Sequence, residues 1–215
     1  TMTSGPGTLR DRMLRRATFI TGCSQHVVRQ AIRAVPEIES RALTIYNGCH
    51  DPGVPIAPLP FALPRILCVG RLVESKGFDE VLRALPAVLL RHPAARLTIA
   101  GDGPHRLALE HECDRLRLRG CTEFAGAIAR DRVFDLLNAA TLLVVPSRGG
   151  AEGLPMVALE AALMERPVVV TRDGGLPETV VDGETGFLIE SRDRDGLARS
   201  ILRVLDDPEL AARLG

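Results

Sequence analysis

Short apolar runs alternate along most of this chain with segments in which apolar residues recur at every third or fourth position. The apolar runs predict strands at residues 65–70, 96–101, 141–145, 167–171 and 186–189. Helical spacing is clearest over residues 78–89, where Val81, Leu82 and Leu85 would share one buried face. Strands that alternate with helices are typical of a parallel sheet covered by helices. The pattern therefore predicts an α/β fold with an open parallel sheet of the doubly wound type.

The segment before this alternation forms a separate pattern. A strand at 18–21, a helix that begins after the capping residue Ser24 and a strand at 43–46 make one strand–helix–strand unit. Such a unit cannot bury both of its faces alone, so it is either an appendage of the main sheet or the edge of a missing domain. Five prolines stiffen the segment that follows. We expect an N-terminal remnant at 1–51, a linker at 52–64 and a main domain at 65–215.

Composition narrows the class of protein. Of the 215 residues, 46% are hydrophobic, which is enough for a buried core. Basic and acidic residues both number 27, so the formal net charge is zero and bulk attraction to nucleic acid is excluded. Aromatic residues make up only 3%, so the chain lacks the stacking surfaces of single-strand binders and carbohydrate-binding modules. Any anion site must therefore be local.

The cysteines and the absence of long apolar stretches bear on the compartment. The five cysteines form no C-x-x-C pair, which favours reduced thiols in a cytoplasmic protein. No apolar stretch reaches the roughly 18 residues that span a bilayer. The basic segment 10–16 favours a solvated helix face, and peripheral contact with anionic lipid at the inner membrane face stays open as an alternative.

Candidate chemistry lies in the loops after the predicted strands, because ligands of open α/β sheets bind outside the carboxyl ends of the strands. Arg71 and Lys76 follow the strand 65–70 in one loop that leads into a helix. A guanidinium, an ammonium and the free N–H groups of a helix start together suit a diphosphate. The alternative is a pair of solvated surface cations.

A glycine-rich loop follows the strand 141–145 and leads to Pro155, which opens a helix. Glu152 lies in this loop and Glu160 in the helix. A carboxylate accepts hydrogen bonds from two neighbouring hydroxyls, as a ribose or a hexose offers them, so the pattern predicts a sugar on each side of a diphosphate. Each glutamate alone also suits an ordinary position near a helix start. Two carboxylates can form an acid–base pair for hydrolysis, but this setting favours groups that hold hydroxyls.

Three further motifs resemble metal or cofactor sites, but each lacks a feature that such a site needs or has a simpler explanation. The run 193–195 has the D-x-D spacing of metal-dependent transferases, but it follows a serine at a helix start, where capping explains it. The run 111–113 holds a histidine, a glutamate and a cysteine with no fourth ligand nearby. The run 101–106 begins like a dinucleotide fingerprint but lacks its third glycine. We predict no metal and no cofactor.

Seven motifs in order resemble a known family. They stand at 70–71 with 76–77, 100–104, 124–126, 145–147, 152–161, 167–169, and 174–178 with 182–186. Their order and spacing are similar to those of the group 1 (family four) retaining glycosyltransferases of the two-domain B-type fold. The resemblance implies that this chain is the C-terminal, Rossmann-like donor-binding domain. Residues 163–166 depart from the family's glycine-containing turn, which leaves the shape of that loop open.

The resemblance also implies roles for single residues. In such enzymes, the residues that match Arg71 and Lys76 neutralise the donor diphosphate without a metal. The residue that matches Glu152 holds the transferred hexose, and the residue that matches Glu160 holds the ribose hydroxyls. Arg71, Lys76 and Glu152 are thus the expected catalytic residues. Further donor contacts are expected at Gly153, Leu154, Pro155, Met156 and Val157, and contacts with the nucleobase at Gly126 and Ile128.

The family places its acceptor site and a catalytic histidine in an N-terminal domain, of which residues 17–47 resemble only the last part. We therefore expect a retaining, metal-independent glycosyltransferase fragment that binds a nucleoside-diphosphate hexose. Alone it would transfer poorly or not at all, because the missing domain would hold the sugar, lipid or other acceptor. The alternatives are a non-catalytic binding or regulatory module and a nucleotide-sugar epimerase of the same fold. The sugar, the base, the acceptor and the oligomeric state stay open.

Overall fold

The computed structural model describes residues 8–150 and 152–215. These residues form two compact units, one that ends at Gly48 and one that begins at Cys49. The proline-rich segment belongs to the second unit, where the amide of Ala57 donates to the side-chain oxygen of Asn138 at 2.7 Å. None of the helices in the described residues is long and apolar enough to cross a bilayer.

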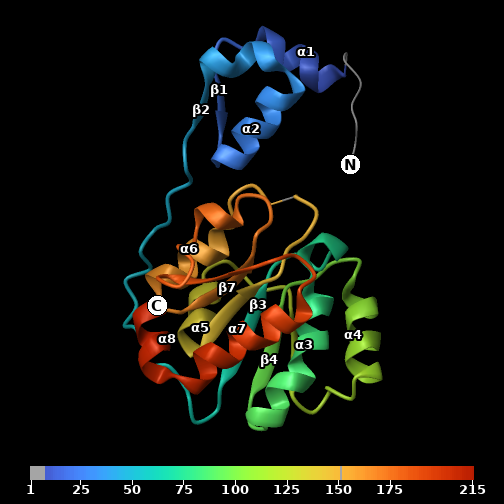
Figure 1. Cartoon of the computed structure of the whole chain (residues 1–215), viewed down its shortest axis with the longest axis vertical. Coiled ribbons are helices and arrows are strands. Elements are labelled where there is room, and N and C mark those ends of the chain that lie inside the picture. Colours follow the sequence, from blue (N-terminus) through green and yellow to red (C-terminus); the bar gives the residue numbers. More distant parts are fainter. Residues whose placement is uncertain (1–7, 151) are drawn as a thin grey trace. The chain divides into compact units, whose positions relative to one another are not determined.

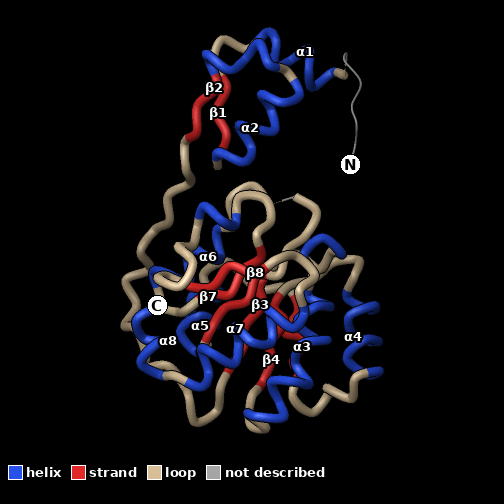
Figure 2. The backbone as a smooth tube through the Cα atoms, in the orientation of Figure 1, coloured by secondary structure: helices blue, strands red, loops and turns tan. Residues whose placement is uncertain are grey.

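The second unit is built on a parallel sheet in which the described residues supply six strands (Figure 2). The strands are β3 (Arg65–Val69), β4 (Arg96–Ala100), β5 (Thr122–Gly126), β6 (Leu142–Val145), β7 (Val168–Thr171) and β8 (Gly186–Ile189). Their order is β5-β4-β3-β6-β7-β8, and every neighbouring pair is parallel. The predicted α/β fold with an open, doubly wound parallel sheet is confirmed. β5 was absent from the predicted strands, because it is only half-buried and has no continuous apolar run.

Helices cover both faces of this sheet (Figure 1). They are α3 (Phe78–Arg91), α4 (Arg106–Arg115), α5 (Arg132–Ala139), α6 (Met156–Leu163), α7 (Arg194–Asp206) and α8 (Pro208–Leu214), with short 3-10 turns η2 (Glu74–Lys76) and η3 (Leu176–Glu178). Within β3, Ile66 packs into the core on the side of α3, α4 and α7, whereas Leu67 packs into the core on the side of α5 and α6. Successive residues of a strand point to opposite faces, so a continuous apolar run marks a strand that is buried on both sides.

The chain changes direction across the sheet between β3 and β6. It passes outward from β3 through β4 to β5, and then returns to the other side of β3 to continue as β6, β7 and β8. The loops after β3 and β6 therefore meet at the switch point, the place where doubly wound sheets bind ligands. At Gly77 the backbone is left-handed (φ 67°), and a Cβ atom there would lie 2.1 Å from the carbonyl oxygen of Pro146. Glycine at this position lets the two loops touch.

The turn at residues 163–166, which departs from the family pattern, holds the proline-rich segment against the rest of the second unit. Glu165 takes the left-handed conformation (φ 54°) that a glycine would adopt without strain. The fully buried Arg166 donates to the carbonyl oxygens of Leu137 and Asn138, each at 3.0 Å, and to that of Ala57 at 2.5 Å. The guanidinium thus satisfies buried carbonyl groups from two separate segments of the chain.

The first unit is small. It holds α1 (Leu9–Arg16), β1 (Ile20–Gly22), α2 (Gln25–Ala34), the 3-10 turn η1 (Pro36–Arg41) and β2 (Ala42–Thr44). Ser24 caps α2 as predicted, since its side chain accepts from the amide of Val27 at 3.2 Å. The two strands pair in parallel in a two-stranded sheet of their own. Both alternatives raised by the sequence, an appendage of the main sheet and the edge of a missing domain, stay predictions.

Candidate functional site

Lys76 and Glu152 meet at the switch point of the sheet. The Nζ atom of Lys76 lies 2.5 Å from Oε1 of Glu152, and the hydroxyl of Ser147 donates to the same oxygen at 2.6 Å. The side chains of Lys76 and Glu152 are 25% and 13% exposed, so the pair is partly shielded from solvent. Residues distant in the sequence thus form one polar cluster. Two of the three predicted catalytic residues are in direct contact.

The loop after β7 supports Glu152 from another side. The amide of Gly175 donates to the carbonyl oxygen of Glu152 at 2.9 Å, and a Cβ atom at Gly174 would lie 2.5 Å from that oxygen. The carboxylate of Asp173 accepts from the amide of Gly150 at 2.8 Å. Ser147, Asp173 and the two glycines were not among the predicted site residues. Their place at the carboxyl ends of β6 and β7 is the sequence signal that could have found them.

Glu160 lies in a different environment. It belongs to α6, is only 6% exposed and lines a cavity of about 680 Å³. Other lining residues include Cys49, His50, Arg130 and Phe134, whereas Glu152 is not among them. Burial raises the pKa of Glu160, and the nearby charge of Arg130 lowers it in part. A buried carboxylate facing an open cavity can accept hydrogen bonds from a ligand's hydroxyl groups.

Arg71 is exposed, and within residues 8–150 and 152–215 no hydrogen bond or ion pair of its side chain is recorded. It lines a cleft of about 240 Å³ together with Gly101, Asp102 and Ile128. The structure therefore brings the predicted diphosphate contact Arg71 and the predicted base contact Ile128 to one cleft. Gly126, the last residue of β5, has the left-handed φ of 74° and leads the chain into this cleft.

The predicted backbone contacts from Gly153 to Val157 lie at the start of α6. Pro155 precedes the helix as its capping residue and Met156 is its first residue. The first amides of a helix have no acceptor within the helix, so they are available to a negatively charged group. The side chain of Leu154 is buried, so it packs into the protein and anchors the loop.

The acidic motifs that resembled metal sites have structural partners. The side chain of Asp193 caps α7 by accepting from the amide of Gly196 at 2.8 Å, as predicted. Glu112 accepts from Arg83 at 2.6 Å and from Arg115 at 2.7 Å. In the described part of the chain, no group of three or more histidine, cysteine, aspartate or glutamate residues is arranged to hold a metal ion.

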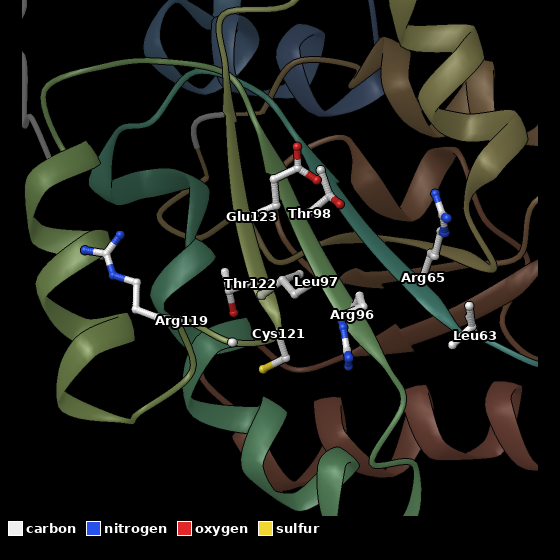
Figure 3. Close-up of a pocket in the computed structure, with 10 residues that line it drawn as sticks. Leu63, Arg65, Arg96, Leu97, Thr98, Arg119, Cys121, Thr122 and Glu123 are labelled. Atoms are coloured by element: carbon white, nitrogen blue, oxygen red, sulfur yellow. The ribbon is translucent and has the colours of Figure 1, made fainter.

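A third pocket, of about 430 Å³, lies at the opposite, amino ends of β3, β4 and β5 (Figure 3). Arg65, Arg96 and Arg119 line it, but their guanidinium groups point away from one another in Figure 3. Arg96 donates to the carbonyl oxygen of Ala95 at 2.9 Å, and Arg119 pairs with Asp114. The three guanidinium groups do not converge on one point, so the pocket is not arranged to bind an anion.

Comparisons with known proteins agree with the fold. The model of the family described as "Glycosyl transferases group 1" matches residues 59–215. A glycogen synthase of Mycobacterium tuberculosis is 39% identical over 168 residues, which cover 75% of this chain and 40% of that protein. A GDP-mannose-dependent phosphatidylinositol monomannoside mannosyltransferase of Mycolicibacterium smegmatis is 36% identical over 157 residues, covering 71% of this chain and 41% of that protein.

Among solved structures, the HepE protein of Anabaena in complex with UDP-glucose superposes with a TM-score of 0.82 at 25% identity. The match covers 95% of this chain and 58% of that protein. The chain thus spans about two fifths of the length of the curated relatives it matches.

Proposed function

Because the chain belongs to the glycosyl transferases of group 1, we propose that residues 49–215 bind the nucleoside-diphosphate hexose donor of a retaining glycosyl transfer. Contact between Lys76 and Glu152 at the switch point of the sheet is the observation that carries this proposal. It joins a cation suited to a diphosphate to a carboxylate suited to a sugar hydroxyl. The matched mannosyltransferase is named for GDP-mannose and the matched HepE structure contains UDP-glucose, which supports a donor of this class.

In this proposal Arg71 and Lys76 take the diphosphate. Arg71 offers an exposed fork of donors from the loop after β3, with no side-chain partner in the described part of the chain, and Lys76 offers an ammonium group in the same loop. Two fixed cations at the leaving group stabilise the negative charge that develops when the bond from the hexose to the phosphate breaks. The same charges make a divalent metal unnecessary for donor binding.

The two glutamates hold the two sugars on either side of the diphosphate. Glu152 lies beside Lys76 and takes a hydroxyl of the hexose, while Glu160 takes the ribose hydroxyls from its separate cavity. The nucleobase then lies near Ile128, in the cleft that Arg71 also lines. Neither glutamate acts as general acid or base, because both are committed to positioning the donor.

The acceptor is held by a part of the protein that lies outside this chain. The chain spans about two fifths of the length of its curated relatives, and the described residues of its first unit contribute a two-stranded sheet. We therefore propose that the chain binds the donor and does not transfer the hexose efficiently by itself. A longer chain that includes the acceptor-binding part would carry out the reaction.

Isothermal titration calorimetry tests the donor site directly. UDP, GDP, ADP, UDP-glucose and GDP-mannose are titrated into the chain in EDTA, and one base is expected to bind with a dissociation constant of about 1 µM to 1 mM, the usual span of KM values. The Arg71→Gln/Lys76→Met double variant should lose this binding, whereas Arg65→Gln, at the other end of the same strand, should keep it. Binding that requires magnesium, or no binding of any nucleotide, overturns the proposal.

A further inference from the structure

Arg148 forms an unusually large number of contacts for a residue in a glycine-rich loop. Its Nη1 atom lies 3.1 Å from Oδ2 of Asp79 and 3.3 Å from Oε1 of Glu80, and its Nη2 atom lies 3.5 Å from Glu74. The backbone amide of Arg148 donates to the carbonyl oxygen of Ser75 at 2.7 Å. Every one of these contacts reaches the loop after β3 or the first turn of α3. Arg148 therefore joins the loop of Glu152 to the loop of Lys76.

The carboxylates that pair with Arg148, those of Asp79 and Glu80, are buried. The side chains of Asp79 and Glu80 are 8% and 11% exposed, and Arg83 also pairs with them, at 2.7 and 3.2 Å. The Nε atom of Arg194 lies 3.8 Å from the other carboxylate oxygen of Glu80. Arg83 is shared with Glu112, so its charge is divided among three carboxylates. One oxygen of Asp79 is buried without a hydrogen-bond partner in the described residues. Without Arg148, Asp79 would keep only the shared charge of Arg83 among the described residues, and Glu80 would keep Arg83 and the more distant Arg194.

Arg148 lies directly before two glycines in the loop that leads to Glu152. Gly149 and Gly150, which follow it, both have left-handed backbones (φ 88° and 68°), which glycine adopts without strain. The amide of Gly150 donates to Asp173 in the loop after β7. The loop is therefore held to the loop after β7 through Gly150 and to the loop of Lys76 through Arg148.

We propose that Arg148 is a positioning residue that locks the loop of Glu152 onto the loop of Lys76 through Asp79 and Glu80. Its guanidinium is only 13% exposed and is occupied by carboxylates, so it does not contact the donor. It acts by setting where the carboxylate of Glu152 lies relative to the ammonium of Lys76. The effect of Arg148 on donor recognition rests on the proposed function, whereas its effect on the loops does not.

Hydrogen–deuterium exchange of the chain without nucleotide tests the lock itself. In Arg148→Met, the amides of residues 147–150 and 152–154 and of residues 74–77 should exchange faster by about tenfold, because a local opening that breaks these contacts becomes easier. Arg91→Met is the matched control. It removes an ion pair with Asp206 from the other end of α3, so those loops should exchange as in the parent chain. Arg148→Lys, which keeps one charge, should give an intermediate rate and serves if Arg148→Met fails to fold.

A second readout separates positioning from a general loss of stability. In the parent chain, the ratio of the dissociation constant of the nucleoside diphosphate to that of its sugar conjugate reports the contribution of Glu152. Arg148→Met should lower this ratio by about tenfold, while a merely structural role would weaken both ligands equally. Unchanged exchange in both loops, or acceleration spread evenly over the whole chain, overturns the proposal for Arg148. Failure of the parent chain to bind any nucleotide would instead overturn the proposed function and leave the exchange result to decide on the lock.

Discussion

The Nζ atom of Lys76 lies 2.5 Å from a carboxylate oxygen of Glu152, and the hydroxyl of Ser147 donates a hydrogen bond to the same oxygen. The cation proposed for the diphosphate is thus already paired with the carboxylate proposed for the hexose. A nucleoside diphosphate must compete with Glu152 for Lys76, whereas a nucleotide sugar offers Glu152 hydroxyl groups in return. The chain should therefore prefer nucleotide sugars to free nucleotides.

Glu152→Gln should abolish this preference. The neutral amide releases Lys76, so the free nucleoside diphosphate should bind as well as before or more tightly. The nucleotide sugar loses a charged hydrogen-bond acceptor, which should weaken it by about tenfold or more. Calorimetry with both ligands measures the two changes. Glu123→Gln, which removes an exposed carboxylate from the edge strand β5, should alter neither.

Glu160→Gln should stabilise the chain while weakening nucleotide binding. Burial raises the pKa of Glu160 above its ordinary value, so the charged form destabilises the folded state at neutral pH. Replacing it should raise the free energy of unfolding by about 1 kcal/mol at pH 7. Below the ordinary pKa of 4.5 the carboxyl is protonated in both states, and the gain should vanish. Urea denaturation at pH 7 and at pH 4 measures this difference, and a variant that is less stable at pH 7 would contradict it.

Gly77→Ala should damage the contact between the two ligand loops. A Cβ atom at Gly77 would lie 2.1 Å from the carbonyl oxygen of Pro146, in addition to the strain of its left-handed backbone. We expect a loss of at least about 2 kcal/mol of stability and weaker nucleotide binding. Gly183→Ala is the control, because Gly183 is also left-handed (φ 79°) but has open space around it. It should cost only the backbone strain, about 1 kcal/mol, and leave binding intact.

Acid should weaken the fold through Glu112. Hydrogen bonds from Arg115 and then from Arg83 lower the pKa of Glu112 to about 2, against an ordinary value of 4.5. A group whose pKa is lowered on folding stabilises the folded state above its ordinary pKa and loses that contribution as the pH falls from 4.5 toward 2. Glu112→Gln should therefore cost about 2 kcal/mol at pH 7 and almost nothing near pH 2. Thermal unfolding of both proteins across this range checks the convergence.

The local pattern of apolar residues predicted most strands of the sheet. β3, β4, β6, β7 and β8 are buried on both faces, so each carries a continuous apolar run that the sequence displays. β5 was not predicted, because it carries threonine and glutamate among its apolar residues and is only half-buried. β8 lies at the other edge of the sheet but keeps an apolar run, so the sequence displayed it. The place of β5 beside β4 is set by hydrogen bonds between the strands, which are a property of the folded sheet.

The site divides in the same way. Arg71, Lys76, Glu152 and Glu160 could be predicted from the loops that follow predicted strands and from the order of the family motifs. Which of these residues meet could not be predicted. Tertiary packing decides that Lys76 pairs with Glu152 and that Glu160 faces a different cavity. It also decides that Arg148 pairs with Asp79 and Glu80.

The sequence by itself determined most of the strands of the sheet and which loops carry chemistry, because hydrophobic periodicity and turn residues act over a few positions of the chain. Only the tertiary structure decided which charges meet. The partners Lys76 and Glu152 are 76 residues apart, and Arg148 and Asp79 are 69 apart. Their contacts exist because the strand order places β6 beside β3 and because Gly77 lets the two loops touch.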